Sequence, residues 1–449
     1  MKHRSCPLLA SIALAVLLAA APASAQIPRT GPEQEPARPF QGLFGGNQSN
    51  LQSRQALNVN FSFFLDYEDN DVTAPNADAI YQLEPLMTQT GFYFGGATSL
   101  DYRKRWRRAA LTAAGGTSAR YYPDQHEFAR MRDWATVAFT YAFGPKTTLN
   151  ASQSAWYSAY FMNGWFPGMN PAVAGQPITP GFDNYTYYRP NWQFNTAIDF
   201  QRRLTQASSF SAYGNLTYID FLKKGNYPSA TYYAGQLSLR YQHSITKNLA
   251  FRGGYSFNRW RHGLIFIPDE HTRGDNLELG LDFQKTLRVS GRQTTIGASG
   301  GLTWITFQEN QYYTYLIHAY ATTMVTQKWF ANLAYDRNFS FVEGLAAPYA
   351  TDSVTMNVGG YLNRRTNLSF AGGYTHGVGV ATSASRSYGA WIGSAQLQVA
   401  LTEKVALFGQ GYFYHFDFKG SYPYSPLPTR GWNRWGVRGG VTLWIPILR

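Results

Sequence analysis

The chain is poor in cysteine and in charge. Its one cysteine, Cys6, lies near the N-terminus, and only 14% of the 449 residues are charged. Beyond residue 25 we therefore expect no disulfide, no thiolate metal site and no cysteine nucleophile. No apolar run in that part of the chain reaches the ~20 residues that a membrane-spanning helix needs.

The first 25 residues have the pattern of a secretory signal peptide. Lys2 and Arg4 form a basic head, an apolar run covers 8–21, and the small residues at 23–25 match a cleavage site. A membrane anchor is the alternative, but the run is too short for one and ends in the cleavage pattern. We therefore expect export and removal of residues 1–25.

The segment 26–55 is polar and contains four prolines, at positions 28, 32, 36 and 39. This composition is typical of a disordered segment. At ~30 residues the segment is also too short to form the folded plug found inside large energised transporters. We expect a disordered N-terminal segment, followed by one domain that covers 56–449.

What the chain has in abundance is glycine and aromatic side chains: 42 Gly, 32 Tyr, 30 Phe and 12 Trp. Aromatic residues favour strands, and glycine disfavours helices. The apolar residues recur at every second position, as they do on one face of a strand and not of a helix. Alternating segments of this kind include 192–200, 237–242, 249–258, 277–283, 354–362 and 397–401.

A repeat of about forty residues organises these strands. Six threonines in short polar stretches follow one another at intervals of 41, 40, 40, 40 and 36 residues: Thr205, Thr246, Thr286, Thr326, Thr366 and Thr402. A propeller blade has a similar period but carries four short strands. Here each period holds two alternating runs long enough to cross a bilayer at a tilt, which requires ~9–11 residues. We predict that the repeated unit is a transmembrane β-hairpin closed by a threonine turn.

The sequence predicts eighteen such strands between residues 56 and 447, within a range of 16 to 18. An even number returns both termini to one side of the membrane, as in single-chain outer-membrane barrels. The predicted fold is all-β: a closed antiparallel transmembrane β-barrel with short periplasmic turns and longer extracellular loops. The longest loop, 162–188, carries four prolines and is a candidate for narrowing the lumen.

With this pattern the chain resembles bacterial outer-membrane β-barrels and is similar to the loosely defined β-barrel porin families. The resemblance covers 56–449 and depends on pattern, without a family motif. It implies a location in the outer membrane and a passive or substrate-selective pore for small hydrophilic solutes. One departure is the ending WIPILR, since such barrels commonly end in an aromatic residue.

Two alternative functions remain open. A conduit for polysaccharide export would use inward aromatic rings at Tyr412, Tyr414 and Phe416, unless a shift of one residue turns these rings toward lipid. A barrel-embedded lipid hydrolase would need a serine, a histidine and a carboxylate or amide together, and no pair in the sequence stands out. We therefore predict no enzyme and no catalytic residue.

The inner face of the predicted strands supplies the candidate site. Six polar residues are predicted to line the pore: Arg240, Arg252, Asp282, Glu278, Asp199 and Asn258. A turn centred at 245–246 places Arg240 opposite Arg252, and the next strand brings Asp282 beside Arg252. We expect either a salt bridge that stiffens the wall or a charged ring that sets ion selectivity.

The partners expected from this reading are those of an exported barrel. They are outer-membrane lipid with its lipopolysaccharide and the barrel-assembly machinery, with self-association into a homo-oligomer left open. The basic stretch 103–108 suits a membrane rim better than nucleic acid. We expect no metal and no cofactor. Once the leader is removed, 37 basic residues face 26 acidic ones, an excess that favours anions in the lumen.

Overall fold

The structure is a computed structural model. It describes residues 54–72, 90–162, 185–222, 230–262, 270–289, 292–307, 310–326, 329–341, 348–379, 387–419 and 432–448. The predicted leader and nearly all of the predicted disordered segment therefore lie outside the described residues. The barrel begins at Gln55, one residue earlier than expected.

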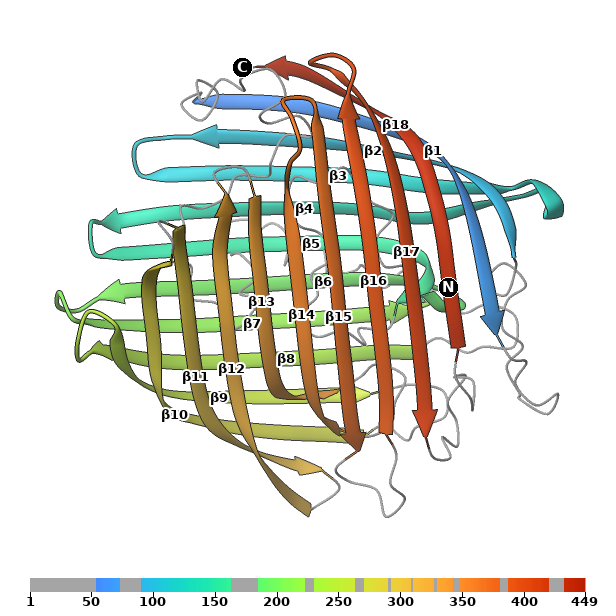
Figure 1. Ribbon diagram of the computed structural model, residues 1–449. Helices are drawn as coiled ribbons and strands as arrows, with labels where there is room; N and C mark the ends of the chain where they lie inside the picture. Colours follow the sequence, from blue (N-terminus) through green and yellow to red (C-terminus); the bar gives the residue numbers. More distant parts are fainter. Residues whose placement is uncertain are drawn as a thin grey trace, which may run out of the picture.

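The described residues form eighteen strands (Figure 1). The strands are β1 (Gln55–Val72), β2 (Gly91–Arg105), β3 (Ala109–Tyr122), β4 (Glu127–Gly144), β5 (Thr147–Met162), β6 (Tyr185–Arg203), β7 (Ser208–Phe221), β8 (Ala230–Ser244), β9 (Leu249–His262), β10 (Glu270–Val289), β11 (Arg292–Phe307), β12 (Asn310–Thr326), β13 (Trp329–Phe341), β14 (Pro348–Tyr361), β15 (Thr366–Gly379), β16 (Ser387–Ala400), β17 (Val405–Lys419) and β18 (Trp432–Leu448). A 3-10 turn, η2 (Pro123–Gln125), links β3 to β4. Among the described residues, no helix is long and apolar enough to cross a membrane.

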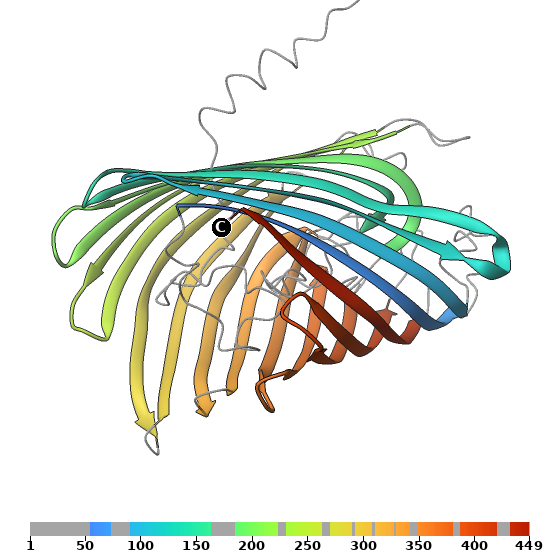
Figure 2. The same cartoon turned by 90° about the horizontal axis from the view of Figure 1, so that it is seen from above.

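The sheet closes on itself. Each strand pairs antiparallel with its neighbours in sequence, and β18 pairs with β1 from Leu57↔Leu448 to Val72↔Trp432. In Figure 1 the strands of the near wall cross those of the far wall steeply, as tilted strands of a barrel do. Figure 2 shows the wall returning from β18 to β1. The predicted closed antiparallel barrel of eighteen strands is confirmed.

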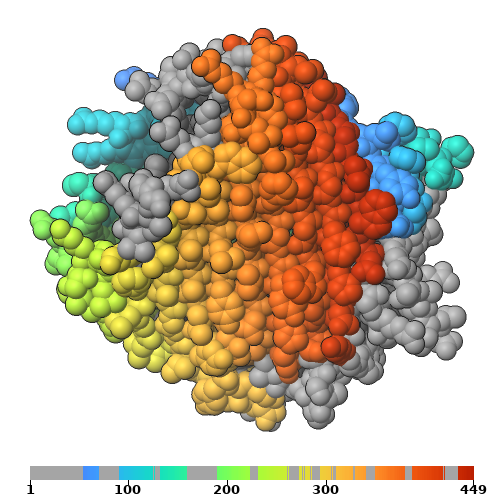
Figure 3. Space-filling view, viewed as in Figure 1, coloured from blue at the N-terminus to red at the C-terminus, as the bar shows by residue number. Residues whose placement is uncertain are grey.

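The two faces of the wall differ in chemistry. Along β1, Phe63 and Leu65 are 58% and 43% exposed, whereas Ser62 and Asp66 are 4% and 0% exposed. Large apolar side chains are exposed in the same alternating way on strands around the whole barrel. Figure 3 shows the continuous surface that the near-wall strands form. Since successive strand residues point to opposite faces, the apolar set lies outside and the polar set inside.

The connections differ in length at the two ends of the barrel. Those that leave even-numbered strands contain two to four residues, and the chain termini of the barrel lie at this end. At the other end most connections are longer, and the longest runs from 163 to 184. The turns β3–β4 and β11–β12 are short exceptions. The predicted inward loop 162–188 lies outside the described residues apart from its two ends, which belong to β5 and β6.

Three of the six predicted threonine turns are built as expected. Thr205, Thr246 and Thr402 each accept, through Oγ1, the backbone N–H groups of the residues two and three positions later. This side-chain acceptor satisfies two donors that the hairpin turn leaves without a ladder partner. The residues before these threonines are Leu204, Ile245 and Leu401, and all three are exposed at the rim.

The other three threonines correct the prediction. In the β14–β15 turn the acceptor is Asn363, whose Oδ1 binds the N–H groups of Arg365 and Thr366, and Thr366 is the first residue of β15. Thr286 lies within β10, and Thr326 is the last residue of β12. The forty-residue period is therefore real, but threonine marks only some of its turns, because asparagine supplies the same short acceptor.

The unusual C-terminal sequence is accommodated in the last strand. Pro446 pairs with Asn58, and Leu448 pairs with Leu57, so the register shifts by one residue between them. Proline lacks the N–H that a regular ladder needs and is found at bulges and strand ends. The bulge therefore lets β18 continue past Pro446 to the end of the barrel.

Candidate functional site: the polar inner face

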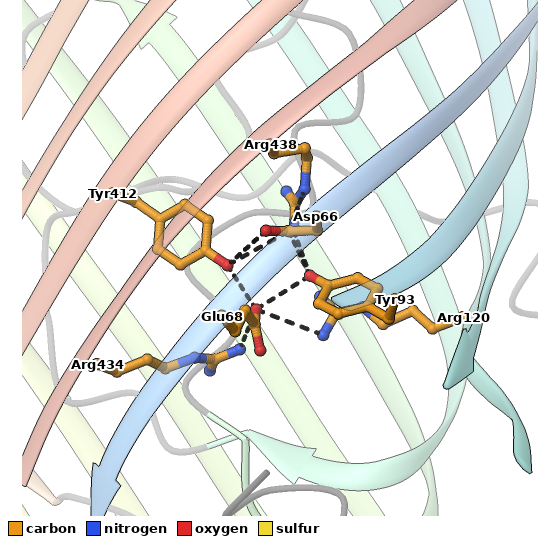
Figure 4. Close-up of polar contacts among 7 residues, drawn as sticks. All are labelled: Asp66, Glu68, Tyr93, Arg120, Tyr412, Arg434 and Arg438. Carbon is orange, nitrogen blue, oxygen red and sulfur yellow. Dashed lines mark hydrogen bonds and ion pairs between the residues drawn. The ribbon is translucent and has the colours of Figure 1, made fainter. Parts of the chain in front are cut away.

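The inner face carries a network of polar side chains linked from strand to strand. Its most buried part lies at the seam, where β18 meets β1. We call it the seam cluster, and it consists of Asp66, Glu68, Tyr93, Arg120, Tyr412, Arg434 and Arg438 (Figure 4). Five strands contribute to it, from β17 to β3 by way of the closure.

Two carboxylates from β1 occupy the centre of the seam cluster. Arg438 donates to Asp66 from Nε at 2.6 Å, and Arg434 donates to Glu68 from Nη2 at 2.6 Å. Tyr412 donates to Glu68 at 2.5 Å, and the Tyr93 hydroxyl contacts both carboxylates. In Figure 4 the arginines and tyrosines converge on the two acids from both sides of β1.

The seam cluster balances charges that would be costly to bury alone. Asp66 and Arg438 are 0% and 1% exposed as side chains, and Glu68 and Arg434 are 6% and 7% exposed. A third arginine, Arg120, lies 3.9 Å from Glu68 and stacks 4.5 Å from the centre of the Tyr93 ring. Desolvated charges are tolerated only with close partners and satisfied hydrogen bonds. The seam cluster therefore fastens the closing strands together.

A glycine makes the central contact of the seam cluster possible. Gly436 pairs with Tyr412 on one side and with Glu68 on the other. A Cβ at this position would lie 2.5 Å from Tyr412 Cζ and 2.8 Å from the backbone oxygen of Tyr67. Only the missing side chain lets the Tyr412 ring cross β18 and reach the β1 carboxylates.

Sequence reasoning did not find the seam cluster. The signal was present, because Asp66 and Glu68 alternate on the inner face of the first strand and Arg434 and Arg438 do so on the last. Their pairing needs the closure register, which joins residues 372 positions apart at Arg438 and Asp66. No local pattern supplies that register.

The predicted contact between Arg252 and Asp282 is present. Arg252 Nε lies 3.5 Å from Asp282 Oδ1, and Gln242 donates to Asp282 at 3.4 Å. The predicted opposition of Arg240 and Arg252 is wrong, because Arg252 pairs with Gln242 and Arg240 pairs with Gly254. The turn is centred on Lys247, one residue later than expected, so the facing pairs shift by two positions and both arginines stay on the inner face.

The other predicted pore residues take separate places. Asp199 is half-buried and accepts from Asn150 at 3.1 Å and from Gln201 at 2.7 Å. Asn258 is 6% exposed and pairs with Gln236 in the β8–β9 register. Glu278 pairs with Gly254 along the backbone, and its side chain lies outside the described part of the structure. Arg240 is half-buried on β8. Among the five of these residues whose side chains the structure describes, Arg252 and Asp282 are the pair brought into contact.

The aromatic stripe on β17 faces inward. Tyr412, Tyr414 and Phe416 are 9%, 3% and 1% exposed, whereas Phe413 between them is 45% exposed. The centre of the Tyr414 ring lies 6.0 Å from the Arg434 guanidinium carbon. The Tyr414 and Phe416 rings are stacked, with their centres 6.3 Å apart. Since all three rings are buried, they do not present a free face on which a sugar could stack.

Fold and inner face together define a closed barrel with an apolar outside and a polar, charged inside.

No protein-family model matches the chain, and no curated protein matches it in sequence. Similar solved structures include OpdQ of Pseudomonas aeruginosa, at 10% identity and a TM-score of 0.43, covering 89% of this chain and 100% of that one. OccK2 (OpdF) of the same organism, also solved in complex with glucuronate, has 9% identity and a TM-score of 0.45, covering 88% and 98%. The siderophore receptor PirA has 7% identity and a TM-score of 0.44, covering 87% and 80%.

Proposed function

We propose that this protein is an outer-membrane pore for the passive or selective passage of small hydrophilic solutes. The observation that carries the proposal is the division of the wall into an apolar outer face and an inner face of linked polar and charged side chains. A filled barrel would need apolar inward residues. A barrel of sixteen to eighteen strands is wide enough to enclose an aqueous channel.

The outer surface supports insertion in a bilayer. Exposed leucines, phenylalanines and tyrosines occur on strands all around the wall, and a lipid-facing band of this kind is characteristic of transmembrane barrels. The partners that follow are outer-membrane lipid with its lipopolysaccharide and the assembly machinery that inserts barrels. An exported chain of this kind requires a cleaved leader, for which residues 1–25 are suited.

Conductance of the purified barrel in planar lipid bilayers tests the proposal. We expect stepwise channel openings in the absence of any energy source, with a conductance that grows with salt concentration. The folded state is checked beforehand by the shift in gel mobility on heating. A barrel that is folded and inserted but carries no ion current would contradict the proposal.

Export of a polysaccharide is a weaker candidate on this structure. It would require aromatic rings open to the lumen, and the inward stripe at Tyr412, Tyr414 and Phe416 is covered by its neighbours. Solute uptake by proteoliposomes separates the two functions. Swelling in isotonic monosaccharide is expected of a pore for small solutes, whereas entry of long glycans with exclusion of monosaccharides would favour export.

A further inference from the structure

Three polar side chains stand in one row on the inner face, at mid-height of adjacent strands. Ser299 of β11 pairs directly with His318 of β12, and His318 pairs directly with Asp336 of β13. All three point inward, since the flanking Leu302, Ile317 and Leu333 are exposed on the outer face. Directly paired residues on one face have Cβ atoms ~4.5–5.5 Å apart, within the reach of serine, histidine and aspartate side chains.

The histidine is held by the carboxylate. His318 Nδ1 lies 2.5 Å from Asp336 Oδ1, and the imidazole is 5% exposed. An Nδ1–H that donates to a carboxylate leaves Nε2 with its lone pair free, on the side of the ring away from Asp336. In the part of the chain that the structure describes, His318 Nε2 is buried and has no hydrogen-bond partner. An unsatisfied buried nitrogen of this kind needs a physical explanation.

Ser299 lies on β11 directly beside His318, on the side away from Asp336, and among the described residues its hydroxyl makes no hydrogen bond to Nε2, so a rotation of the Ser299 side chain is what would bring Oγ to this nitrogen. It is half-buried, so its side chain is more accessible than the imidazole beside it. The sequence on its C-terminal side, Gly300 and Gly301, adds no bulk around it. Opposite Ser299 the β10–β11 register is irregular between Leu277↔Leu302 and Phe283↔Ala298. Such irregularities disrupt the ladder locally and often lie beside active sites.

A hydroxyl donor lies one inward position away from Ser299. Tyr320 pairs with Gly297, and its ring occupies the space that a side chain at Gly297 would fill, with Cζ 2.5 Å from that Cβ position. Among the described residues the Tyr320 hydroxyl is buried and has no hydrogen-bond partner. A preorganised donor beside a nucleophile can stabilise the oxyanion that forms during acyl transfer.

We propose that Ser299, His318 and Asp336 form a serine-hydrolase triad that cleaves carboxylic esters of solutes entering the lumen. Ser299 Oγ attacks the ester carbonyl, and His318 Nε2 accepts the hydroxyl proton. The carbon–oxygen bond to the alcohol breaks, the alcohol leaves with that proton, and the acyl group stays on Oγ. Water then attacks the acyl group, gives a proton to Nε2 and releases the acid, and Ser299 regains its proton. Asp336 is a positioning residue that holds the imidazole.

Another inward serine has no histidine beside it and can be compared with Ser299. Ser154 of β5 pairs with Thr136 and Asn195, and it accepts a hydrogen bond from Thr136 at 3.1 Å. It has the same barrel environment and no imidazole opposite it. Ser154 therefore provides a matched control for a nucleophile that depends on the row.

The first test is covalent labelling of the folded barrel in detergent with a biotinylated fluorophosphonate. Attack by an activated serine breaks the phosphorus–fluorine bond and leaves the phosphonate on Oγ. We expect one label, located at Ser299 by mass spectrometry, which is lost in Ser299→Ala and kept in Ser154→Ala. His318→Gln should slow labelling by roughly 10²–10⁴-fold. Absence of label from the wild-type barrel, or labelling unchanged by Ser299→Ala, would overturn the proposal.

Turnover of p-nitrophenyl butyrate tests whether Asp336 positions the imidazole or contributes to substrate binding. Asp336→Asn should lower kcat by roughly 10²–10⁴-fold and change KM little, because it disturbs the imidazole and not the lumen. Equal kcat in wild type and Asp336→Asn would count against the triad. Single-channel conductance of Ser299→Ala should match the wild type, so loss of hydrolysis with retained current distinguishes this activity from the pore itself.

Discussion

Arg438 Nε donates to Asp66 Oδ2 at 2.6 Å across the pair of strands that closes the barrel. Both side chains are fully buried, and both also contact a tyrosine hydroxyl, Tyr93 for the arginine and Tyr93 and Tyr412 for the aspartate. Each side chain therefore has an opposite charge beside it and a tyrosine hydroxyl that fixes its position. The first and last strands are therefore joined by side chains as well as by their backbone ladder.

Breaking this pair should destabilise the folded barrel strongly. Arg438→Met leaves Asp66 buried without its main counter-charge, and loss of one partner of a buried pair typically costs about 3–5 kcal/mol. We expect a lower midpoint of urea-induced unfolding in lipid vesicles, followed by tryptophan fluorescence. The double variant Asp66→Asn with Arg438→Met should lose less than the sum of the two single variants.

A pair at the end of a strand is the control for that experiment. Lys419 and Asp417 form an ion pair at 3.7 Å at the end of β17, with side chains 73% and 44% exposed. Exposed pairs contribute about 0–1 kcal/mol, so Lys419→Met should change the midpoint little. Equal losses in Lys419→Met and Arg438→Met would contradict a special role for the seam cluster.

Removing Arg252 should shift ion selectivity. Arg252 faces inward and partners Asp282, whose side chain is 15% exposed. Arg252→Ala leaves that carboxylate without its closest cation, so the permeability ratio should move toward cations. The reversal potential in a salt gradient measures the change, and Arg337→Ala on the outer face should leave it unaltered. An unaltered value in Arg252→Ala would reduce the Arg252–Asp282 bridge to a structural role.

Filling the gap at Gly436 should separate Tyr412 from the seam cluster. In Gly436→Ala the new methyl group collides with the Tyr412 ring and with the Tyr67 backbone oxygen. Overpacking of this kind costs about 1–3 kcal/mol, measured as a lower unfolding midpoint. Gly411→Ala on β17 meets nothing within 4 Å and should be tolerated. Similar midpoints for the two variants would show that the Tyr412 contact is dispensable.

Threonine and asparagine should be interchangeable in the short turns. Thr246→Ala removes the acceptor for the N–H groups of Asn248 and Leu249, and each net hydrogen bond contributes about 0.5–1.5 kcal/mol. We expect a modest loss of stability in Thr246→Ala and little loss in Thr246→Asn, because Asn363 fills the same role in another turn. The same urea titration measures both, and an equal loss in the two variants would rule out the side-chain acceptor as the stabilising feature.

Much of the fold could be predicted from local sequence. The alternating segments 192–200 and 249–258 lie within β6 and β9, and the predicted inward direction of Arg252 follows from counting by two. This works because the pleat of a strand sends alternate side chains to opposite faces whatever the strand pairs with. Hydrophobicity then decides which face meets lipid.

The candidate site depended on information that no local pattern carries. The β8–β9 turn is centred on Lys247, one residue later than expected, so every facing pair of these strands differs from the predicted one by two positions. The position of the turn depends on the hydrogen bonds that Thr246 accepts and not on the average forty-residue period.

The alternating pattern by itself predicted the all-β fold and sixteen to eighteen long strands, and the even strand number of such barrels then favoured a closed wall. Tertiary structure alone decided which residues meet: Asp66 with Arg438 across the closure, and Ser299 with His318 and Asp336 across three strands. The physical reason is that alternation repeats every two residues, so many registers satisfy it equally well. The choice among them is made by turn geometry and by contacts between strands distant in sequence.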